Sequence, residues 1–330
     1  MGRHSKRGMC LLVGIFLGIL LSAPVFGQPS KGGDFPTHEI KYTVQYSPGG
    51  GWDTLARYIA PLMAENLPKK VPIVIRNISG GQGMIGINTL YTSPPDGYTI
   101  GCVSSGNVMG QMVGKANYDM RRFNWLGIMS SDYYMTAASH KSGFKKLKDL
   151  QDCGREVLVG TSGLATLDGL AGMAQGKHIG YKVKTIVHKG SNEAMLAAAR
   201  GDVDIITYPF GTVRKMAIDS NELVPLWVSF PERPRGLNVP TLNELGFQKL
   251  SSLLCLHRLV GTPPKIPEDR LKILRQAFQA VIARPGFDEI LATKFDSTIN
   301  RAGQKEIETI VNECFTMLEP YKDVIASAWQ

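Results

Sequence analysis

Two glycine-rich segments of the chain offer backbone chemistry that suits an anion. They read Ser47-Pro48-Gly49-Gly50-Gly51-Trp52-Asp53-Thr54 and Ser79-Gly80-Gly81-Gln82-Gly83-Met84-Ile85-Gly86. Glycine lets successive N–H groups turn toward one point, and a helix that follows adds partial positive charge at its N-terminus. The pair predicts a small basin for a carboxylate or phosphate. The alternative interpretation is that both segments are merely tight strand-to-helix turns.

The elements around these segments decide where the basin would lie. Apolar alternation predicts strands over 39–46, 71–77 and 98–104, and helical spacing predicts helices over 53–65 and 86–91. This alternation predicts a mostly parallel sheet flanked by helices. Open sheets of that kind bind ligands at the carboxyl ends of their strands, which is where both glycine segments lie.

The same alternation returns after residue 130. Its small polar residues again follow the strands, so a second α/β unit with its own polar edge is predicted. Its expected strands cover 157–160, 184–187, 203–207 and 224–229, and its expected helices cover 167–175 and 192–200. The tail of the chain is separately predicted to be helical over 267–283 and 304–327.

The first 27 residues have the pattern of a secretory signal. Basic residues precede an apolar stretch over 9–21, which is shorter than the roughly 20 residues that a membrane span needs. Val25 and Gly27 suit the −3 and −1 positions of a cleavage site, which predicts cleavage after Gly27 and a periplasmic protein. An uncleaved anchor is the alternative.

Charge and cysteine content narrow the function classes. The 330 residues carry a formal charge of +9, but the basic residues are scattered, so no nucleic-acid partner is expected. A mild positive field would still attract anionic ligands. Cys102, Cys153, Cys255 and Cys314 remain after cleavage and could form disulfides in three ways or stay as buried thiols.

Catalytic patterns are weak in this sequence. The six histidines have no metal-ligand spacing, and Gly160-Thr161-Ser162-Gly163 is not a nucleophile elbow of G-x-S-x-G form. No enzyme activity, metal or cofactor is therefore expected. Residues 81–86 do spell G-x-G-x-x-G, which keeps an exported dinucleotide-binding enzyme as an alternative, although an acidic residue about 20 positions further on is missing.

The order of motifs resembles the solute-binding receptors of the tripartite tricarboxylate transporters, called the Bug family. The resemblance is collinear and extends over nearly all of the chain after the signal. It rests on Pro48-Gly49-Gly50-Gly51, Arg76-Asn77, the turn at 80–86, Pro95-Asp96-Gly97-Tyr98-Thr99, Thr161-Ser162-Gly163, Lys189-Gly190, the run 240–246, and Gly261-Thr262-Pro263.

The resemblance implies a two-lobed periplasmic binding protein of the Venus-flytrap, type II-like kind. Each α/β lobe would be a mostly parallel sheet flanked by helices, with residues 34–128 and 253–330 in lobe 1 and 129–252 in lobe 2. The ligand cleft would lie between the lobes. The implied function is a monomeric receptor that delivers a di- or tricarboxylate, aromatic acid or acidic amino acid to integral membrane subunits. A periplasmic sensor for a carboxylate is the alternative.

The resemblance also implies the solute-binding residues. Trp52 and Tyr208 depart from the family pattern. The Trp52 ring could lie under an aromatic solute, and the Tyr208 hydroxyl could donate a hydrogen bond to a distal carboxylate. The alternative is that both rings simply pack at the cleft edge. The implied residues are Ser47, Gly50, Gly51, Trp52 and Asp53 in the first turn, Gly81, Gln82, Gly83 and Met84 in the second, Ser104, Ser105 and Asn107 after the third strand, and Thr161, Ser162, Thr166, Lys189 and Tyr208 in lobe 2.

Overall fold

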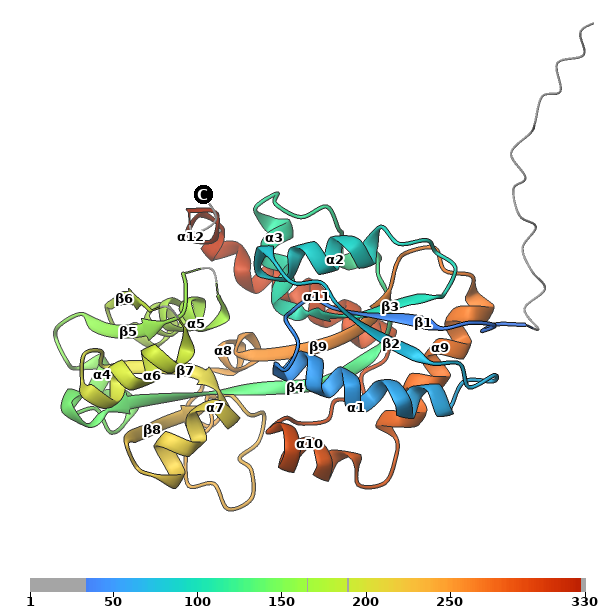
Figure 1. Ribbon diagram of the computed structural model, residues 1–330. Helices are drawn as coiled ribbons and strands as arrows, with labels where there is room; N and C mark the ends of the chain where they lie inside the picture. Colours follow the sequence, from blue (N-terminus) through green and yellow to red (C-terminus); the bar gives the residue numbers. More distant parts are fainter. Residues whose placement is uncertain (1–33, 165, 189, 328–330) are drawn as a thin grey trace, which may run out of the picture. The chain divides into compact units, whose positions relative to one another are not determined.

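The computed structural model describes residues 34–164, 166–188 and 190–327 (Figure 1). The predicted signal segment and Lys189 lie outside these ranges, and so does the side chain of Gln82. Residues Phe35–Gln330 form one unit, to which all that follows applies. In its described part no helix combines the length and the apolar character that crossing a bilayer would need.

The described strands build one nine-stranded sheet. Its order is β2-β1-β3-β9-β4-β7-β5-β6, and β8 pairs with β4 beside this path. The strands are β1 (Ile40–Val44), β2 (Ile73–Asn77), β3 (Thr99–Ser104), β4 (Asn124–Ser139), β5 (Val157–Thr161), β6 (Val183–Val187), β7 (Ile205–Pro209), β8 (Leu223–Val228) and β9 (Cys255–Thr262).

Strand direction divides the sheet into two groups. In the first group β1 pairs in parallel with β2 and β3, and in the second β5 pairs in parallel with β6 and β7. The pairings of β4 and β9, and that of β8 with β4, are antiparallel. The predicted α/β class is confirmed, and the whole sheet is mixed because the antiparallel strands β4 and β9 join the two parallel groups and β8 is antiparallel to β4.

Strand β4 connects the two groups. It runs for 16 residues, first beside β9 and then beside β7 and β8, and Figure 1 shows β4 and β9 side by side between the groups. Only Asn124 and Tyr133 of this strand are not fully buried. A strand that is buried on both faces shows no apolar–polar alternation, which explains why the sequence did not predict it.

Helices cover the sheet. Those expected over 53–65, 86–91, 167–175, 192–200 and 267–283 are present, and the expected 304–327 helix is interrupted by a 3₁₀ turn at Glu319–Tyr321. The helices are α1 (Gly51–Glu65), α2 (Met84–Tyr91), α3 (Val108–Met112), α4 (Leu147–Gln151), α5 (Leu167–Gln175), α6 (Ser191–Arg200), α7 (Phe210–Arg214), α8 (Gln248–Leu253), α9 (Glu268–Ile282), α10 (Phe287–Phe295), α11 (Gln304–Leu318) and α12 (Lys322–Ser327).

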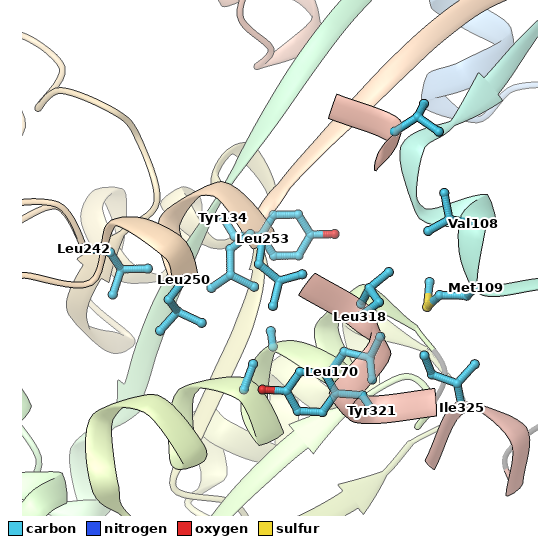
Figure 2. Close-up of a cluster of buried hydrophobic side chains, with 14 of the residues drawn as sticks. Val108, Met109, Tyr134, Leu170, Leu242, Leu250, Leu253, Leu318, Tyr321 and Ile325 are labelled. Carbon is cyan, nitrogen blue, oxygen red and sulfur yellow. The ribbon is translucent and has the colours of Figure 1, made fainter. Parts of the chain in front are cut away.

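One core cluster draws side chains from both strand groups. Figure 2 shows Val108 of α3, Leu170 of α5 and Leu253 of α8 gathered around the C-terminal segment that carries Tyr321 and Ile325. A separate cluster packs α1 and α9 against β1 and β3. The C-terminal helices therefore pack against both groups, although the sequence assigned them to lobe 1.

Close backbone approach requires glycine where α2 passes the end of β1. A Cβ atom on Gly86 would lie 2.6 Å from the Ile78 carbonyl oxygen and 2.8 Å from Gln45 Cα, and backbone atoms cannot move aside as a flexible side chain can. This contact fixes the second glycine turn against β1.

We therefore expect Gly86→Ala to lower the free energy of unfolding by about 1–3 kcal/mol, the usual cost of overpacking. Denaturant unfolding followed by circular dichroism measures it. The control is Gly50→Ala, because Gly50 has a φ of −78° and a Cβ there would have its nearest neighbour, Ser47 O, at 3.8 Å. Equal stability of the two variants would contradict the close approach at Gly86.

Candidate functional site

The first glycine turn is braced by Asp53. Its Oδ2 accepts hydrogen bonds from the Gly49 N–H and from Arg57 Nε, both at 2.9 Å, and its Oδ1 accepts from Asn77 Nδ2 at 2.9 Å. The residue is 2 % exposed. Asp53 was predicted as a solute contact, and in this structure its hydrogen bonds hold the turn to α1 and β2.

These donors stabilise the charged form of the carboxylate. The Arg57 hydrogen bond, followed by those from Gly49 and Asn77, lowers the pKa of Asp53 to about 2 against the opposing effect of burial. The turn around Gly49, Gly50 and Gly51 is thus held by a group that stays ionised at neutral pH.

The second glycine turn lies against Gln45, the residue that follows β1. Gly80, Gly81 and Gly83 have φ values of +121°, +53° and +92°, which side chains other than glycine's rarely adopt. The Gly83 N–H donates to Gly80 O at 3.0 Å, and α2 begins at the next residue. Both predicted turns are therefore at the carboxyl ends of β1 and β2, as expected.

A cavity of about 500 Å³ brings together predicted residues from both strand groups. Ser104 and Asn107 line it from the segment after β3, and Ser162 and Thr166 line it from the segment after β5. Further lining residues, which the sequence did not single out, are Tyr46, Gly106, Met109, Gly110, Tyr134, Gly163, Leu164, Leu167 and Leu256.

The described lining of this cavity carries hydroxyl, amide and apolar groups and no ionisable acid or base other than tyrosine. Such a surface binds a solute through neutral hydrogen bonds and apolar contact. In the described ranges no three His, Cys, Asp or Glu side chains are placed to hold a metal ion.

The segment after β3 is ordered by its own side chains. Ser104 Oγ accepts from the Gly106 N–H at 3.2 Å, and Asn107 Oδ1 accepts from the Ser104 N–H at 2.9 Å. Ser105 Oγ accepts from the His257 N–H at 3.0 Å, which attaches the segment to β9. Ser104 and Asn107 thus line the cavity, whereas predicted Ser105 makes a structural bond.

The segment after β5 is organised by Asp168, which the sequence analysis did not identify. Asp168 Oδ2 accepts from Thr161 Oγ1 at 2.6 Å, from Ser162 Oγ at 2.8 Å and from the Ser162 N–H at 2.7 Å. Thr166 Oγ1 donates to Gly163 O at 2.6 Å. Asp168 is the second residue of α5, and an acid in the first turn of a helix was the signal that could have identified it.

Tyr208 lies on β7 beside this loop. Its ring is 3 % exposed, and its hydroxyl lies near Asp168 and Ser162 without a hydrogen bond of standard geometry. Burial, followed by the charge of Asp168, raises the pKa of Tyr208, so its hydroxyl stays protonated. The predicted hydrogen-bond donor is therefore present, but buried behind the loop instead of among the cavity's lining residues.

Trp52 borders a second cavity of about 620 Å³, which shares Leu256 with the first. The guanidinium of Arg258 lies 5.2 Å from the Trp52 ring centre and pairs with Asp132 at 2.6 Å. Arg258 Nη1 also donates to Ser130 Oγ at 3.1 Å. Sequence reasoning missed Arg258 and Asp132 because it did not predict β4 and β9.

The remaining predicted residues lie at the turns. Ser47, Gly50, Gly51 and Gly81 are exposed, and a Cβ on Gly110, a lining residue of the first cavity, would lie 2.8 Å from Met84 Sδ. Contact between any of these residues and a solute stays a prediction.

The lowered pKa of Asp53 predicts a pH-dependent effect of Asp53→Asn. A lowered pKa stabilises the fold above the unfolded value of about 4, and this contribution disappears as the pH falls through about 2. We expect the difference in unfolding free energy between the unaltered protein and this variant to be largest above pH 5 and to shrink toward pH 2, as measured by denaturant titrations. Asp202→Asn, at an exposed ion pair, should show little difference throughout; a pH-independent effect of Asp53→Asn would contradict the assignment.

Several solved protein structures share this architecture. Among solved structures, a ligand-free TctC solute-binding protein from Polaromonas superimposes with a TM-score of 0.75 at 20 % identity, covering 89 % of this chain and 99 % of that one. Two proteins from Rhodopseudomonas palustris have the same fold. MatC with bound malate has a TM-score of 0.65 at 19 % identity (88 % and 100 % covered), and Rpa4515 with adipate has 0.66 at 20 % (89 % and 98 %). These likenesses establish the two-lobed periplasmic binding protein fold.

Sequence comparison establishes the family. A protein of Agrobacterium vitis, described as "UPF0065 protein in the TAR-I ttuE-ttuC' intergenic region", is 26 % identical over 278 residues, which are 80 % of this chain and 78 % of that protein. The pattern of the "Tripartite tricarboxylate transporter family receptor" matches residues 55–316, most of the chain. The chain therefore belongs to the tripartite tricarboxylate transporter receptor family of periplasmic solute-binding proteins.

Proposed function

We propose that this receptor captures a small carboxylate in the cleft between its lobes and delivers it to integral membrane subunits of a tripartite tricarboxylate-type transporter. The cavity of about 500 Å³ carries the proposal, because residues that follow β3 and residues that follow β5 line it together. Lobe 1 would comprise 34–128 and 253–330, lobe 2 would comprise 129–252, and the mature chain would begin after Gly27 in the periplasm. The similar folds that hold malate and adipate support a carboxylate.

In this proposal the two glycine turns hold one carboxylate through backbone N–H groups. The ionised Asp53 keeps the first turn in place, and the positive φ angles of Gly81 and Gly83 shape the second. Hydroxyl and amide groups of Ser104 and Asn107 complete lobe 1. This arrangement binds without placing a cation in the described lining of the cavity.

Lobe 2 would contact the far end of the solute. Ser162 and Thr166 line the cavity, and their hydroxyls donate to Asp168 and to Gly163 O. Thr166 Oγ1 also accepts from the Gly169 N–H, so the Ser162 oxygen would accept a hydrogen bond from a donor group of the solute. Contacts made in both lobes at once favour the closed state, and a solute that makes them shifts the population toward it. A receptor that works in this way needs no catalytic turnover.

A panel of di- and tricarboxylates, aromatic acids and acidic amino acids tests the proposal by thermal shift. We expect at least one acid at millimolar concentration to raise the melting temperature, since a ligand at 100 times its Kd stabilises by about 2.7 kcal/mol. The matching amides serve as controls, and the acid should be recovered unchanged after incubation. No shift with any organic anion would contradict the proposal.

The first glycine turn offers a sharper test. Gly51 is exposed at the start of α1, and a Cβ there would have Arg258 Nη2 as its nearest neighbour at 3.5 Å, so the fold tolerates a larger residue. We expect Gly51→Val to weaken binding of the panel acid at least tenfold in calorimetric titrations, because its methyl groups would cover the N–H groups of the turn.

Glu268→Val is the matched control, since it alters the exposed first residue of α9, another 15-residue helix, and lines neither cavity. Its affinity should equal that of the unaltered protein. Gly83→Val is less clean because the φ of +92° would strain the turn as well. Full affinity in Gly51→Val, with normal folding, would mean that the carboxylate is held elsewhere.

A further inference from the structure

Gln45 lies at the point where both glycine turns meet the sheet. It directly follows β1, and it has no exposed surface. A Cβ on Gly83 would lie 3.3 Å from the Gln45 amide carbon, so this amide packs directly against the backbone of the second turn. Gly86 of α2 approaches the Gln45 backbone more closely still, since a Cβ there would lie 2.8 Å from Gln45 Cα.

The side-chain amide of Gln45 is buried without the hydrogen bonds that it can form. Among the described residues neither Nε2 nor Oε1 has a hydrogen bond of standard geometry, although the Tyr46 hydroxyl lies near the amide and the group offers two donors and one strong acceptor. Most buried polar side-chain atoms in proteins are hydrogen-bonded, and an unsatisfied one destabilises the fold by its full desolvation cost. An apolar residue of the same length would fill this space at lower cost, so the amide calls for a reason other than packing.

The surroundings of Gln45 connect it to the cavity. Its side chain lies beside the hydroxyl of Tyr46, and Tyr46 lines the cavity of about 500 Å³. Burial raises the pKa of Tyr46 to about 12, so its hydroxyl remains a donor at neutral pH. Tyr46 also contacts Trp52 of the first turn, with ring centres 5.5 Å apart. The amide thus adjoins the second turn on one side and a cavity-lining side chain on the other.

We infer that Gln45 is a solute-binding residue, whose amide N–H group donates to a carboxylate oxygen held at the second glycine turn. The inference rests on the proposed function and adds a side-chain donor to the glycine turns, which otherwise offer the carboxylate backbone N–H groups. It also gives Gly83 a second purpose, since any side chain there would separate the amide from the solute. The unsatisfied amide is then a cost of the empty state that the solute removes.

The substitution Gln45→Met separates this role from packing. Methionine has nearly the same length and shape but cannot donate, so a binding role and a packing role predict different results. We expect the empty variant to melt about 2–4 °C higher than the unaltered protein. We expect its affinity for the carboxylate to fall about 10- to 100-fold, the loss of one hydrogen bond to a charged group.

The probes are malate, adipate and whichever panel acid most stabilises the unaltered protein, measured by calorimetric titration beside thermal melts. Thr43→Val is the matched control, because Thr43 is a buried polar residue of β1, the strand that Gln45 follows, and lines neither cavity. Its affinity should stay within twofold of the unaltered protein. Gln45→Glu should bind more weakly than Gln45→Met, since it adds a like charge.

Unchanged affinity in Gln45→Met, with the unaltered protein binding normally, would overturn the inference and leave the proposed function standing. A lower melting temperature of the empty variant would also overturn it, because the amide would then be satisfied without solute. Failure of the unaltered protein to bind any panel acid would contradict the proposed function itself, and the inference with it.

Discussion

The antiparallel pairing of β4 with β9 is the constraint on which the rest of the structure depends. It joins two parallel strand groups into one sheet, and it sets the carboxyl ends of β1 and β3 opposite that of β5 across a shared cavity. The pair also carries the ion pair of Arg258 with Asp132, and the Arg258 guanidinium lies 5.2 Å from the ring centre of Trp52 in the first turn. The strands that form the framework of the sheet therefore also position the residues that line the cavity.

The chemistry of the site follows from this arrangement. Strand ends supply backbone N–H groups and short polar side chains, while the carboxylates Asp53 and Asp168 organise the turns from behind. Asp168 accepts hydrogen bonds from Thr161 and Ser162 of its own loop, whereas Asp53 accepts one from Gly49 of its turn and others from Arg57 of α1 and Asn77 of β2. An anion bound at such turns is held by fixed dipoles, which favour a position and direction more than a mobile charge would.

Sequence patterns within a few neighbouring residues predicted the features that depend only on such neighbours. Glycine spacing, helix starts and short alternating strands identified both turns, the parallel groups and cavity residues such as Ser104 and Ser162. The strands β4 and β9 could not be found in this way, because they are largely buried and their pairing joins residues more than a hundred positions apart in the chain. Arg258, Asp132 and the unsatisfied Gln45 were missed for the same reason: their importance lies in non-local neighbours.

The cluster around the C-terminal helices has a consequence for movement between the lobes. Leu170 belongs to α5, whereas Tyr321 and Ile325 belong to the chain's end, and Figure 2 shows them packed together. A motion that parted them would expose apolar surface to water at about 25 cal/mol per Å². The contact between α5 and the C-terminal helices therefore opposes any motion that would separate them, and the hydration of apolar surface sets the free-energy cost of that motion.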